Sequence, residues 1–213
     1  MKISAVIPAY NEAKTIGEIV EILKDHSLVM ETIVVNDGST DKTAQIADKP
    51  GIKVINLAVN QGKGAAMQQG INFCQGDIIL FLDADLLGLK HKHINQLLEP
   101  LLNDSAKMTV GVFNSGRVVT DLAHKITPFL SGQRAMKKEL LDEIEDLNST
   151  DYGVELAITN YVQQQEVKIE KVELKDVSHR MKEEKLGVRK GLIARLKMYW
   201  DLIKNLPNRF KIK

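Results

Sequence analysis

Two aspartates with one small residue between them, Asp83 and Asp85, follow an uncharged apolar run at 78–82. Such a run is typical of a buried strand, and a strand that breaks its pleat there can turn both carboxylates toward one point. Carboxylate oxygens suit Mg²⁺ or Mn²⁺, and either cation can bridge the phosphate oxygens of a ligand. A surface turn with two acids is the alternative, but the chain's other polar clusters favour a metal site.

Three more polar clusters follow apolar runs in the first half of the chain, at 8–12, 36–41 and 60–64. In open α/β sheets, ligands bind beyond the carboxyl ends of the strands. If each run is a strand of one parallel sheet, all four clusters meet at one edge. The sequence therefore predicts a ligand site built from four successive strand ends.

The individual side chains of these clusters leave alternatives open. Asp37 could accept a hydrogen bond from a base or ribose, or only close an Asx-turn. The segment Gly62-Lys63-Gly64 lets the backbone approach a ligand, and Lys63 can reach a phosphate. Its spacing matches neither a P-loop nor a dinucleotide fingerprint, so an ordinary turn before a helix stays equally open.

The periodicity indicates the elements that must position these residues. Apolar runs at 2–7, 31–36, 53–57 and 77–82 alternate with helical spacing at 13–24, 41–47 and 62–73. This alternation predicts an α/β fold with a mostly parallel central sheet flanked by helices. In the second half we expect a helix at 93–102, a strand at 108–113, a long loop at 114–132, helices at 135–147 and 153–163, and one or two strands within 167–177.

Composition and charge limit the classes of protein. The chain has 213 residues, is 27% charged and 44% hydrophobic, and has a net charge of +1, which gives no reason to expect a nucleic-acid partner. Residues 188–213 carry a net +7, which leaves −6 for residues 1–187. The single cysteine, Cys74, excludes an internal disulfide framework and is expected to be a small buried hydrophobe. With neither a signal peptide nor an apolar run of about 20 residues in the sequence, we expect a cytoplasmic location.

The basic segment 188–213 is predicted as a C-terminal amphipathic helix or tail, separate from a domain at 1–187. Lysines recur there at positions 190, 197 and 204, opposite an apolar and aromatic face. This pattern suits a helix lying on an anionic membrane, here the inner membrane face. A helix docked on the body, or on a second subunit of a homodimer, is the other hypothesis.

Taken together, the clusters resemble those of the family-2 glycosyltransferases, which have the nucleotide-sugar-binding GT-A fold. The matching segments are V-I-P-A-Y-N-E (6–12), V-V-N-D-G-S-T-D-K-T (34–43), N-Q-G-K-G-A-A (60–66) and D-I-I-L-F-L-D-A-D (77–85). The resemblance implies a UDP-sugar donor and Mg²⁺ or Mn²⁺. It also implies that the donor is bound by Pro8, Tyr10, Glu12, Asp37, Gly62, Lys63 and Asp83, and that Asp85 holds the metal with Asp83.

The second half is similar to a narrower group, the glucosyl-3-phosphoglycerate synthases and their relatives. The matching segments are G-R-V-V-T (116–120), L-S-G-Q-R-A (130–135), D-Y-G-V-E (151–155) and V-S-H-R (177–180), and the first has one valine more than the expected pattern. This likeness implies that Gly132 and Gln133 shape the donor-sugar side and that His179 is the third metal ligand. Arg117, Thr120, Arg134 and Arg180 are the candidates for binding an anionic acceptor.

The predicted activity is transfer of a sugar, with glucose favoured, from a UDP-sugar to an acceptor. An inverting enzyme would need a carboxylate base, for which Glu155 and Asp151 are the candidates; the phosphoglycerate-type relatives retain configuration instead. The acceptor is predicted to be a small phosphorylated acid, with a polyprenyl phosphate or another lipid as the alternative. A nucleotidyltransferase is the alternative of another class, but its glycine-rich loop after the first strand is missing.

Overall fold

The computed structural model describes residues 1–113, 131–144, 158, 161–162 and 164–180. The chain divides into two units, Met1–Ser178 and His179–Lys213. Arg117, Thr120, Asp151, Glu155 and the predicted tail at 188–213 lie outside the described residues. The second unit is described at His179 and Arg180, and the fold below is that of the first unit.

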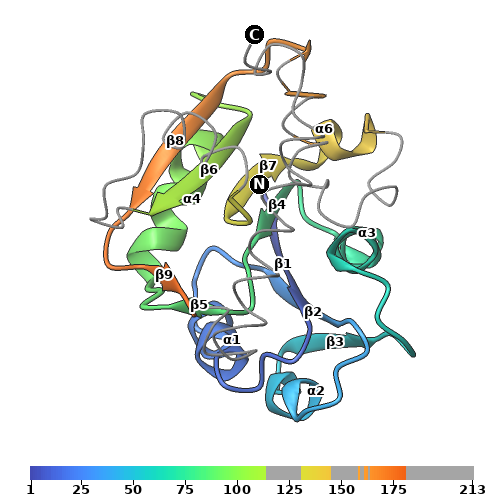
Figure 1. Cartoon of the computed structure of the whole chain (residues 1–213). Helices are drawn as coiled ribbons and strands as arrows, with labels where there is room; N and C mark the ends of the chain where they lie inside the picture. The colour runs from blue at the N-terminus through green and yellow to red at the C-terminus, as the bar shows by residue number, and fades with distance from the viewer. Residues whose placement is uncertain (114–130, 145–157, 159–160, 163, 181–213) are drawn as a thin grey trace, which may run out of the picture. The chain divides into compact units, whose positions relative to one another are not determined.

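Within the described residues, seven strands form one sheet in the order β3-β2-β1-β4-β7-β6-β8 (Figure 1). These strands are β1 (Ile3–Ala9), β2 (Glu31–Asn36), β3 (Ile52–Asn56), β4 (Ile78–Phe81), β6 (Met108–Phe113), β7 (Arg134–Lys137) and β8 (Ile169–Leu174). The helices are α1 (Ile16–Lys24), α2 (Thr43–Ala47), α3 (Lys63–Phe73), α4 (His91–Leu102) and α6 (Lys138–Asp142). Two short strands, β5 (Leu86–Leu87) and β9 (Ser178–His179), lie outside this sheet.

One strand reverses the direction of the sheet. Strands β1 to β4 are parallel, whereas β7 pairs antiparallel with both β4 and β6. The start of β7 therefore meets the end of β4, and Arg134 is registered opposite Phe81. This reversal brings the residues just before β7 to the edge at which β4 ends.

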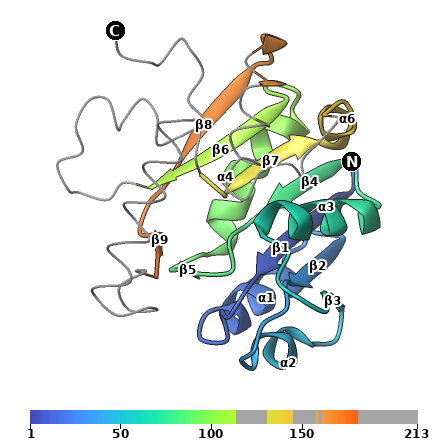
Figure 2. The same ribbon diagram turned by 45° about the vertical axis from the view of Figure 1, so that its right-hand side comes forward.

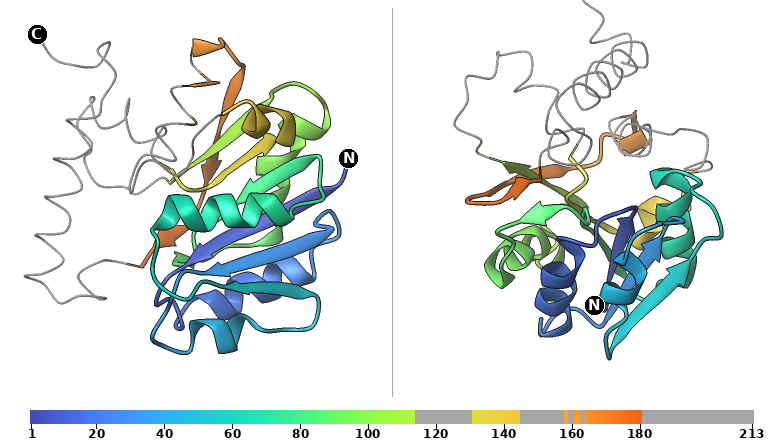
Figure 3. Two further views of the ribbon diagram at one scale, coloured as in Figure 1. Left: turned by 90° about the vertical axis from the view of Figure 1, so that its right-hand side faces the viewer. Right: turned by 60° about the horizontal axis from the view of Figure 1, so that its bottom comes forward.

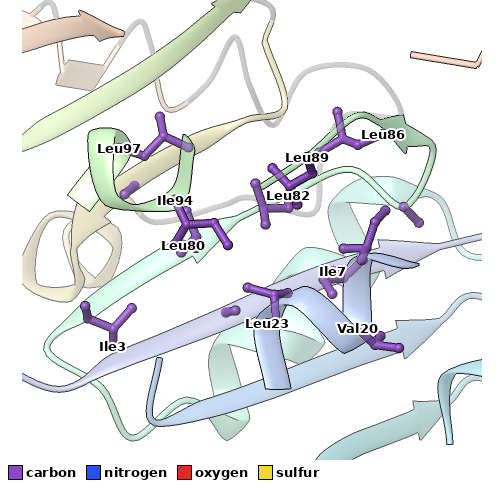
Figure 4. Packing of buried hydrophobic residues seen from close by; sticks show 14 of the residues in the cluster. Ile3, Ile7, Val20, Leu23, Leu80, Leu82, Leu86, Leu89, Ile94 and Leu97 are labelled. Carbon is purple, nitrogen blue, oxygen red and sulfur yellow. The ribbon is translucent and has the colours of Figure 1, made fainter. Parts of the chain in front are cut away.

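Apolar side chains cover both faces of the sheet, as continuous apolar strands require. Ile78 and Leu80 of β4 face one cluster, whereas Ile79 and Phe81 face the other. The first cluster packs under α1, α2 and α4, and Figure 4 shows part of it in close view. The second packs under α3 and α6, and α3 is seen crossing its face in Figure 2. The two views in Figure 3 show these layers from other directions.

The predicted elements of the first half are confirmed, with small differences at their ends. The expected strand at 31–36 and the later one at 108–113 match β2 and β6. The expected helix at 135–147 is wrong at its start, because Arg134–Lys137 is the strand β7. Pairing with neighbours on both sides satisfies the backbone there and outweighs the helical spacing of the sequence.

Two smaller predictions concern Cys74 and membrane spans. Cys74 is buried, which confirms the expected burial, and burial raises the pKa of the thiol to about 12, which favours the protonated, unreactive form. Among the helices of the described residues, none has the length and apolar character that crossing a bilayer requires.

Candidate active site

The predicted polar clusters meet at one edge of the sheet. Ala9 is registered opposite Asn36, and Asn36 opposite Asn56, so β1, β2 and β3 end side by side. Strand β4 pairs with β1 up to Phe81, and the Asp83 segment follows directly. The expectation that four successive strand ends form one edge is therefore confirmed.

Asp37 organises the turn that precedes α3. Its Oδ1 accepts the backbone N–H of Gln61 at 2.7 Å, and its Oδ2 accepts that of Gly62 at 3.0 Å. The carboxylate is buried, with 3% of the residue exposed. Gly62 has φ of 91°, a left-handed conformation that suits glycine. Asp37 therefore fixes the turn from which Lys63 projects, a role that its motif alone did not indicate.

The loops after β1 and β2 are tied to each other by a network that we call the loop latch (Asn11, Glu12, Ser39, Thr40, Asp41 and Thr43). The N–H of Asn11 donates to Ser39 Oγ at 3.0 Å, and the N–H of Thr40 donates to Asn11 Oδ1 at 2.9 Å. The N–H of Glu12 donates to Thr43 Oγ1 at 2.8 Å. The latch gives the Tyr10–Glu12 segment a defined position at the edge, with Tyr10 exposed.

Asp41 is the acidic member of the loop latch. Its carboxylate accepts hydrogen bonds from the side chain and backbone of Thr43 and from the backbone of Ala13. Partial burial raises the pKa of Asp41, but these hydrogen bonds outweigh it and leave the pKa below its usual value of 3.8. The charged form of Asp41 is thus the one that the latch stabilises.

A second group of contacts, which we call the Asp83 centre, consists of Lys63, Asp83, Gly132 and Gln133. Lys63 Nζ lies 2.6 Å from Asp83 Oδ1. Gln133 Nε2 donates to Asp83 Oδ2 at 2.8 Å, while Gln133 Oε1 accepts the N–H of Asp83 at 2.9 Å. Gln133 is fully buried, and both the oxygen and the nitrogen of its side-chain amide bind Asp83. The two segments that supply Asp83 and Gln133 are distant in sequence and are joined by the β4–β7 pairing.

Gly132 lies directly against the carboxylate of Asp83. A Cβ atom at position 132 would be 2.3 Å from Asp83 Oδ1 and 2.4 Å from Oδ2. A side chain there would displace the carboxylate or the backbone. The structure therefore explains a glycine at this position by close approach to Asp83.

The turn between the two aspartates is held by Thr15, the residue that precedes α1. Thr15 Oγ1 donates to the carbonyl oxygen of Ala84 at 2.7 Å, and both residues are buried. Asp83 and Asp85 on either side are partly buried. The pair supplies hard oxygen donors, and Asp83 already accepts a cationic ammonium group, so the chemistry of these residues fits a divalent cation.

The structure gives two of the predicted site residues contacts within the protein. Arg134, for which the resemblance implied acceptor binding, is fully buried and donates from Nε and Nη2 to the carbonyl of Ser131, at 3.1 and 2.6 Å. Gln133, expected beside the donor sugar, binds Asp83. His179 and Arg180 belong to the second unit. Thr15 and Asp41, which sequence reasoning treated as residues near helix starts, are part of the site's support.

Comparison with protein families gives one match over most of the chain. The description "Glycosyl transferase family 2" matches residues 4–161. This range contains both the loop latch and the Asp83 centre.

Curated relatives of two kinds are similar to the chain. Glucosyl-3-phosphoglycerate synthase of Mycolicibacterium smegmatis is 30% identical over 190 residues, covering 73% of this chain and 62% of the relative. Dolichyl-phosphate beta-glucosyltransferase ALG5A of Trichomonas vaginalis is 39% identical over 97 residues, covering 39% of this chain and 30% of the relative. The chain thus spans less than two thirds of the length of these relatives.

Solved structures of glucosyl-3-phosphoglycerate synthase from Mycobacterium tuberculosis are similar in fold to this chain. The complex with Mn²⁺, uridine-diphosphate-glucose and phosphoglyceric acid has a TM-score of 0.72 and 28% identity, over 92% of this chain and 79% of that one. The complex with Mg²⁺ and uridine-diphosphate has the same score, identity and coverage.

Proposed function

Because the chain belongs to glycosyl transferase family 2, we propose that it transfers a glucosyl group from UDP-glucose to a small phosphorylated acid. The observation that carries this proposal is the likeness, over 92% of the chain, to a structure holding Mn²⁺, uridine-diphosphate-glucose and phosphoglyceric acid. Family membership also favours sugar transfer over nucleotidyl transfer, the alternative of another class.

The donor nucleotide is proposed to lie along the edge formed by the ends of β1, β2 and β4. Pro8, Tyr10 and Glu12 would line one side of it, held by the loop latch. The turn fixed by Asp37 would bring Gly62 and Lys63 to the other side. The amino end of α3 begins at Lys63, so the helix dipole and the ammonium group both favour an anionic diphosphate there.

Asp83, Asp85 and His179 are proposed to hold Mg²⁺ or Mn²⁺, since each offers one donor atom of a suitable type. When bound, the metal supplies Lewis-acid stabilisation of the departing diphosphate. The protein's part is to hold the Asp83 carboxylate in place through Gln133 and Gly132.

The acceptor side is proposed from the resemblance. Glu155 or Asp151 would take the acceptor's proton if the reaction inverts configuration. Arginine forks suit the carboxylate and phosphate of a small acid. The proposed acceptor-binding residues are Arg117, Thr120, Arg134 and Arg180; the structure binds Arg134 to Ser131, so for this residue a positioning role is the simpler proposal.

A lipid acceptor is the second candidate. The dolichyl-phosphate glucosyltransferase relative is more identical to this chain, at 39%, but covers only 39% of it. The printed name of that relative makes a lipid-linked phosphate the second acceptor to test. The basic segment 188–213 favours this candidate, because a cationic amphipathic helix would bring the enzyme to the anionic inner membrane face.

The deciding experiment is a transfer assay with Mn²⁺ or Mg²⁺, UDP-glucose and two acceptors, 3-phosphoglycerate and dolichyl phosphate. We expect a glucosylated product with the first acceptor, and proton NMR of its anomeric centre gives the stereochemistry. Product with the lipid alone would replace the proposed acceptor. If no UDP-sugar stabilises the protein or reacts in the presence of metal, the proposed function is wrong.

The location and assembly of the protein are proposed together. We propose a cytoplasmic enzyme whose segment 188–213 contacts either a membrane surface or a second subunit. Flotation with anionic liposomes, with and without residues 188–213, distinguishes the two. Flotation that requires the segment supports the membrane; loss of a dimer in light scattering on its removal supports the subunit contact.

A further inference from the structure

The Asp83 centre contains a cation of its own. Lys63 Nζ lies 2.6 Å from Asp83 Oδ1, a distance typical of a strong charge-assisted hydrogen bond. Asp83 is also one of the residues to which the metal is assigned under the proposed function, and the inference below rests on that function. Under the proposed function, the Asp83 carboxylate therefore binds both the lysine and the metal.

Of the two charged groups, Asp83 is the one that is fixed. Gln133 binds both its backbone N–H and its Oδ2, at 2.9 and 2.8 Å. Gly132 fills the space on another side, since even a Cβ there would lie 2.3 Å from Oδ1. The carboxylate cannot turn to a second position without breaking the amide contacts or moving this backbone. A cation that replaces Lys63 must therefore find Asp83 where it now lies.

Lys63 is the group that can move. Its side chain is 33% exposed, against 18% for that of Asp83, and it reaches the carboxylate through a flexible four-carbon stem. It is the first residue of α3, directly after the turn that Asp37 fixes. Its backbone is thus anchored while its ammonium group can leave Asp83 toward a ligand bound at the same edge.

We propose that Lys63 acts as a stand-in for the metal at Asp83, so that a divalent cation and a nucleoside diphosphate bind as a coupled pair. A divalent cation arriving alone meets an ammonium group on the carboxylate it needs, and like charges at this separation repel. A diphosphate attracts the ammonium group away from Asp83 and also binds the cation. Each ligand thereby improves the site for the other, which is positive coupling between them.

The coupling can be measured without any turnover. Mn²⁺ binding to the full chain is followed by the electron paramagnetic resonance signal of free Mn²⁺, with and without UDP. For the unaltered protein we expect UDP to tighten Mn²⁺ binding about tenfold or more, within the usual range of coupling. In Lys63→Met, we expect Mn²⁺ alone to bind several-fold tighter, and the gain from UDP to shrink to the part that direct binding of the cation by the diphosphate supplies.

Two further variants keep the test sharp. Lys63→Ala should behave as Lys63→Met does, and covers the case in which the longer apolar side chain perturbs folding. Lys24→Met removes a lysine that pairs with Glu21 at 3.8 Å on α1, and controls for the loss of one positive charge. It should leave both Mn²⁺ binding and the effect of UDP unchanged.

The outcomes separate this inference from the proposed function. If Mn²⁺ alone binds Lys63→Met and Lys63→Ala no tighter than the unaltered protein, the stand-in role is wrong, whatever the transfer assay gives. If Mn²⁺ alone binds the variants more tightly but no UDP-sugar reacts, the exchange at Asp83 is correct and the proposed function fails. Coupling that survives intact in both variants also overturns the inference.

Discussion

The loop latch and the Asp83 centre lie at the same edge of the sheet but are held in different ways. In the loop latch, side-chain oxygens of one loop accept backbone N–H groups of the next, and its neighbour Asp37 does the same. In the Asp83 centre, side chains from the start of α3 and from the residue just before β7 converge on one carboxylate. The latch fixes the course of the backbone, whereas the centre fixes one charge.

This difference teaches what each region can tolerate. The loop latch consists of several hydrogen bonds to the backbone. A change in it should therefore lower the free energy of unfolding and affect turnover only indirectly. A single clamped carboxylate has no substitute, so a change there should lower metal binding and turnover directly, even where the protein still folds. The following substitutions test that contrast, from the largest expected effect to the smallest.

Asp83→Asn should give the largest loss of activity. The amide keeps the size of the side chain but removes the charge that holds both Lys63 and the proposed metal. We expect turnover of UDP-glucose to fall roughly a thousandfold, as losing Lewis-acid stabilisation worth several kcal/mol implies. Asp77→Asn, at an aspartate that accepts the N–H of Lys2 at 2.8 Å, is the matched control and should keep its activity. If Asp77→Asn lost as much turnover as Asp83→Asn, the special role of the Asp83 carboxylate would be wrong.

Gly132→Ala should damage the Asp83 centre by crowding. The added Cβ would meet Asp83 Oδ1 at 2.3 Å, so we expect a cost of about 1–3 kcal/mol in unfolding free energy and a marked loss of Mn²⁺ binding. Gly51→Ala is the comparison, because Gly51 has φ of +85° but nothing within 4 Å of a Cβ. It should lower the melting temperature and leave Mn²⁺ binding unchanged. Normal Mn²⁺ binding by Gly132→Ala would contradict the proposed close packing.

Gln133→Leu should loosen the clamp on Asp83 without adding charge. Second-sphere partners of metal ligands are worth about 10–100-fold in metal affinity, and we expect a weakening of that size, measured by Mn²⁺ titration with UDP present. Gln68→Leu is the control, since Gln68 bonds only Asn72 along the exposed side of α3 in the contacts described. An unchanged Mn²⁺ affinity in Gln133→Leu would show that Asp83 needs no clamp.

Asp37→Asn tests the backbone side of the comparison. An amide has one acceptor oxygen, so one of the two N–H groups of Gln61 and Gly62 would lose its partner. We expect a loss of about 1–3 kcal/mol in unfolding free energy, seen in urea unfolding, and weaker UDP binding as the Lys63 turn loosens. Mn²⁺ binding without UDP should change little. The exposed Asp25→Asn should be close to neutral.

The pH dependence of Asp41 should give the smallest effect. The pKa of Asp41 in the folded protein lies below its usual value of 3.8, so the charged carboxylate stabilises the fold above that value. This contribution is lost as the pH falls through the folded-state pKa. The melting temperature of the unaltered protein should therefore drop below about pH 4. In Asp41→Asn the drop should be smaller; an identical drop would mean that the latch does not depend on this charge.

Much of the fold could be predicted because its signals are local. The β-branched run at 31–36 and the polar residues after it were enough to predict β2 and the edge where it ends. The apolar run at 78–82 likewise predicted β4, after which Asp83 and Asp85 follow. In such segments, period and turn chemistry agree with the final structure.

The rest depends on contacts between distant segments, which no local pattern contains. Residues 135–137 have helical spacing, yet they form a strand because β4 and β6 supply hydrogen bonds on both sides. The clamp by Gln133 follows from that same strand, and the pairing of Lys63 with Asp83 joins the start of α3 to the segment after β4. The resemblance to known enzymes predicted that these residues matter, but the structure gives Gln133 its partner.

The reversed strand β7 also has a consequence for the integrity of the chain. Without it, β4 would become the border of the sheet, and its four residues, Ile78–Phe81, are all buried and apolar. An unpaired apolar strand is a template for joining another copy of itself, so a fragment ending before residue 131 should aggregate. The strand that brings Gln133 to Asp83 also keeps β4 from pairing with another copy of itself.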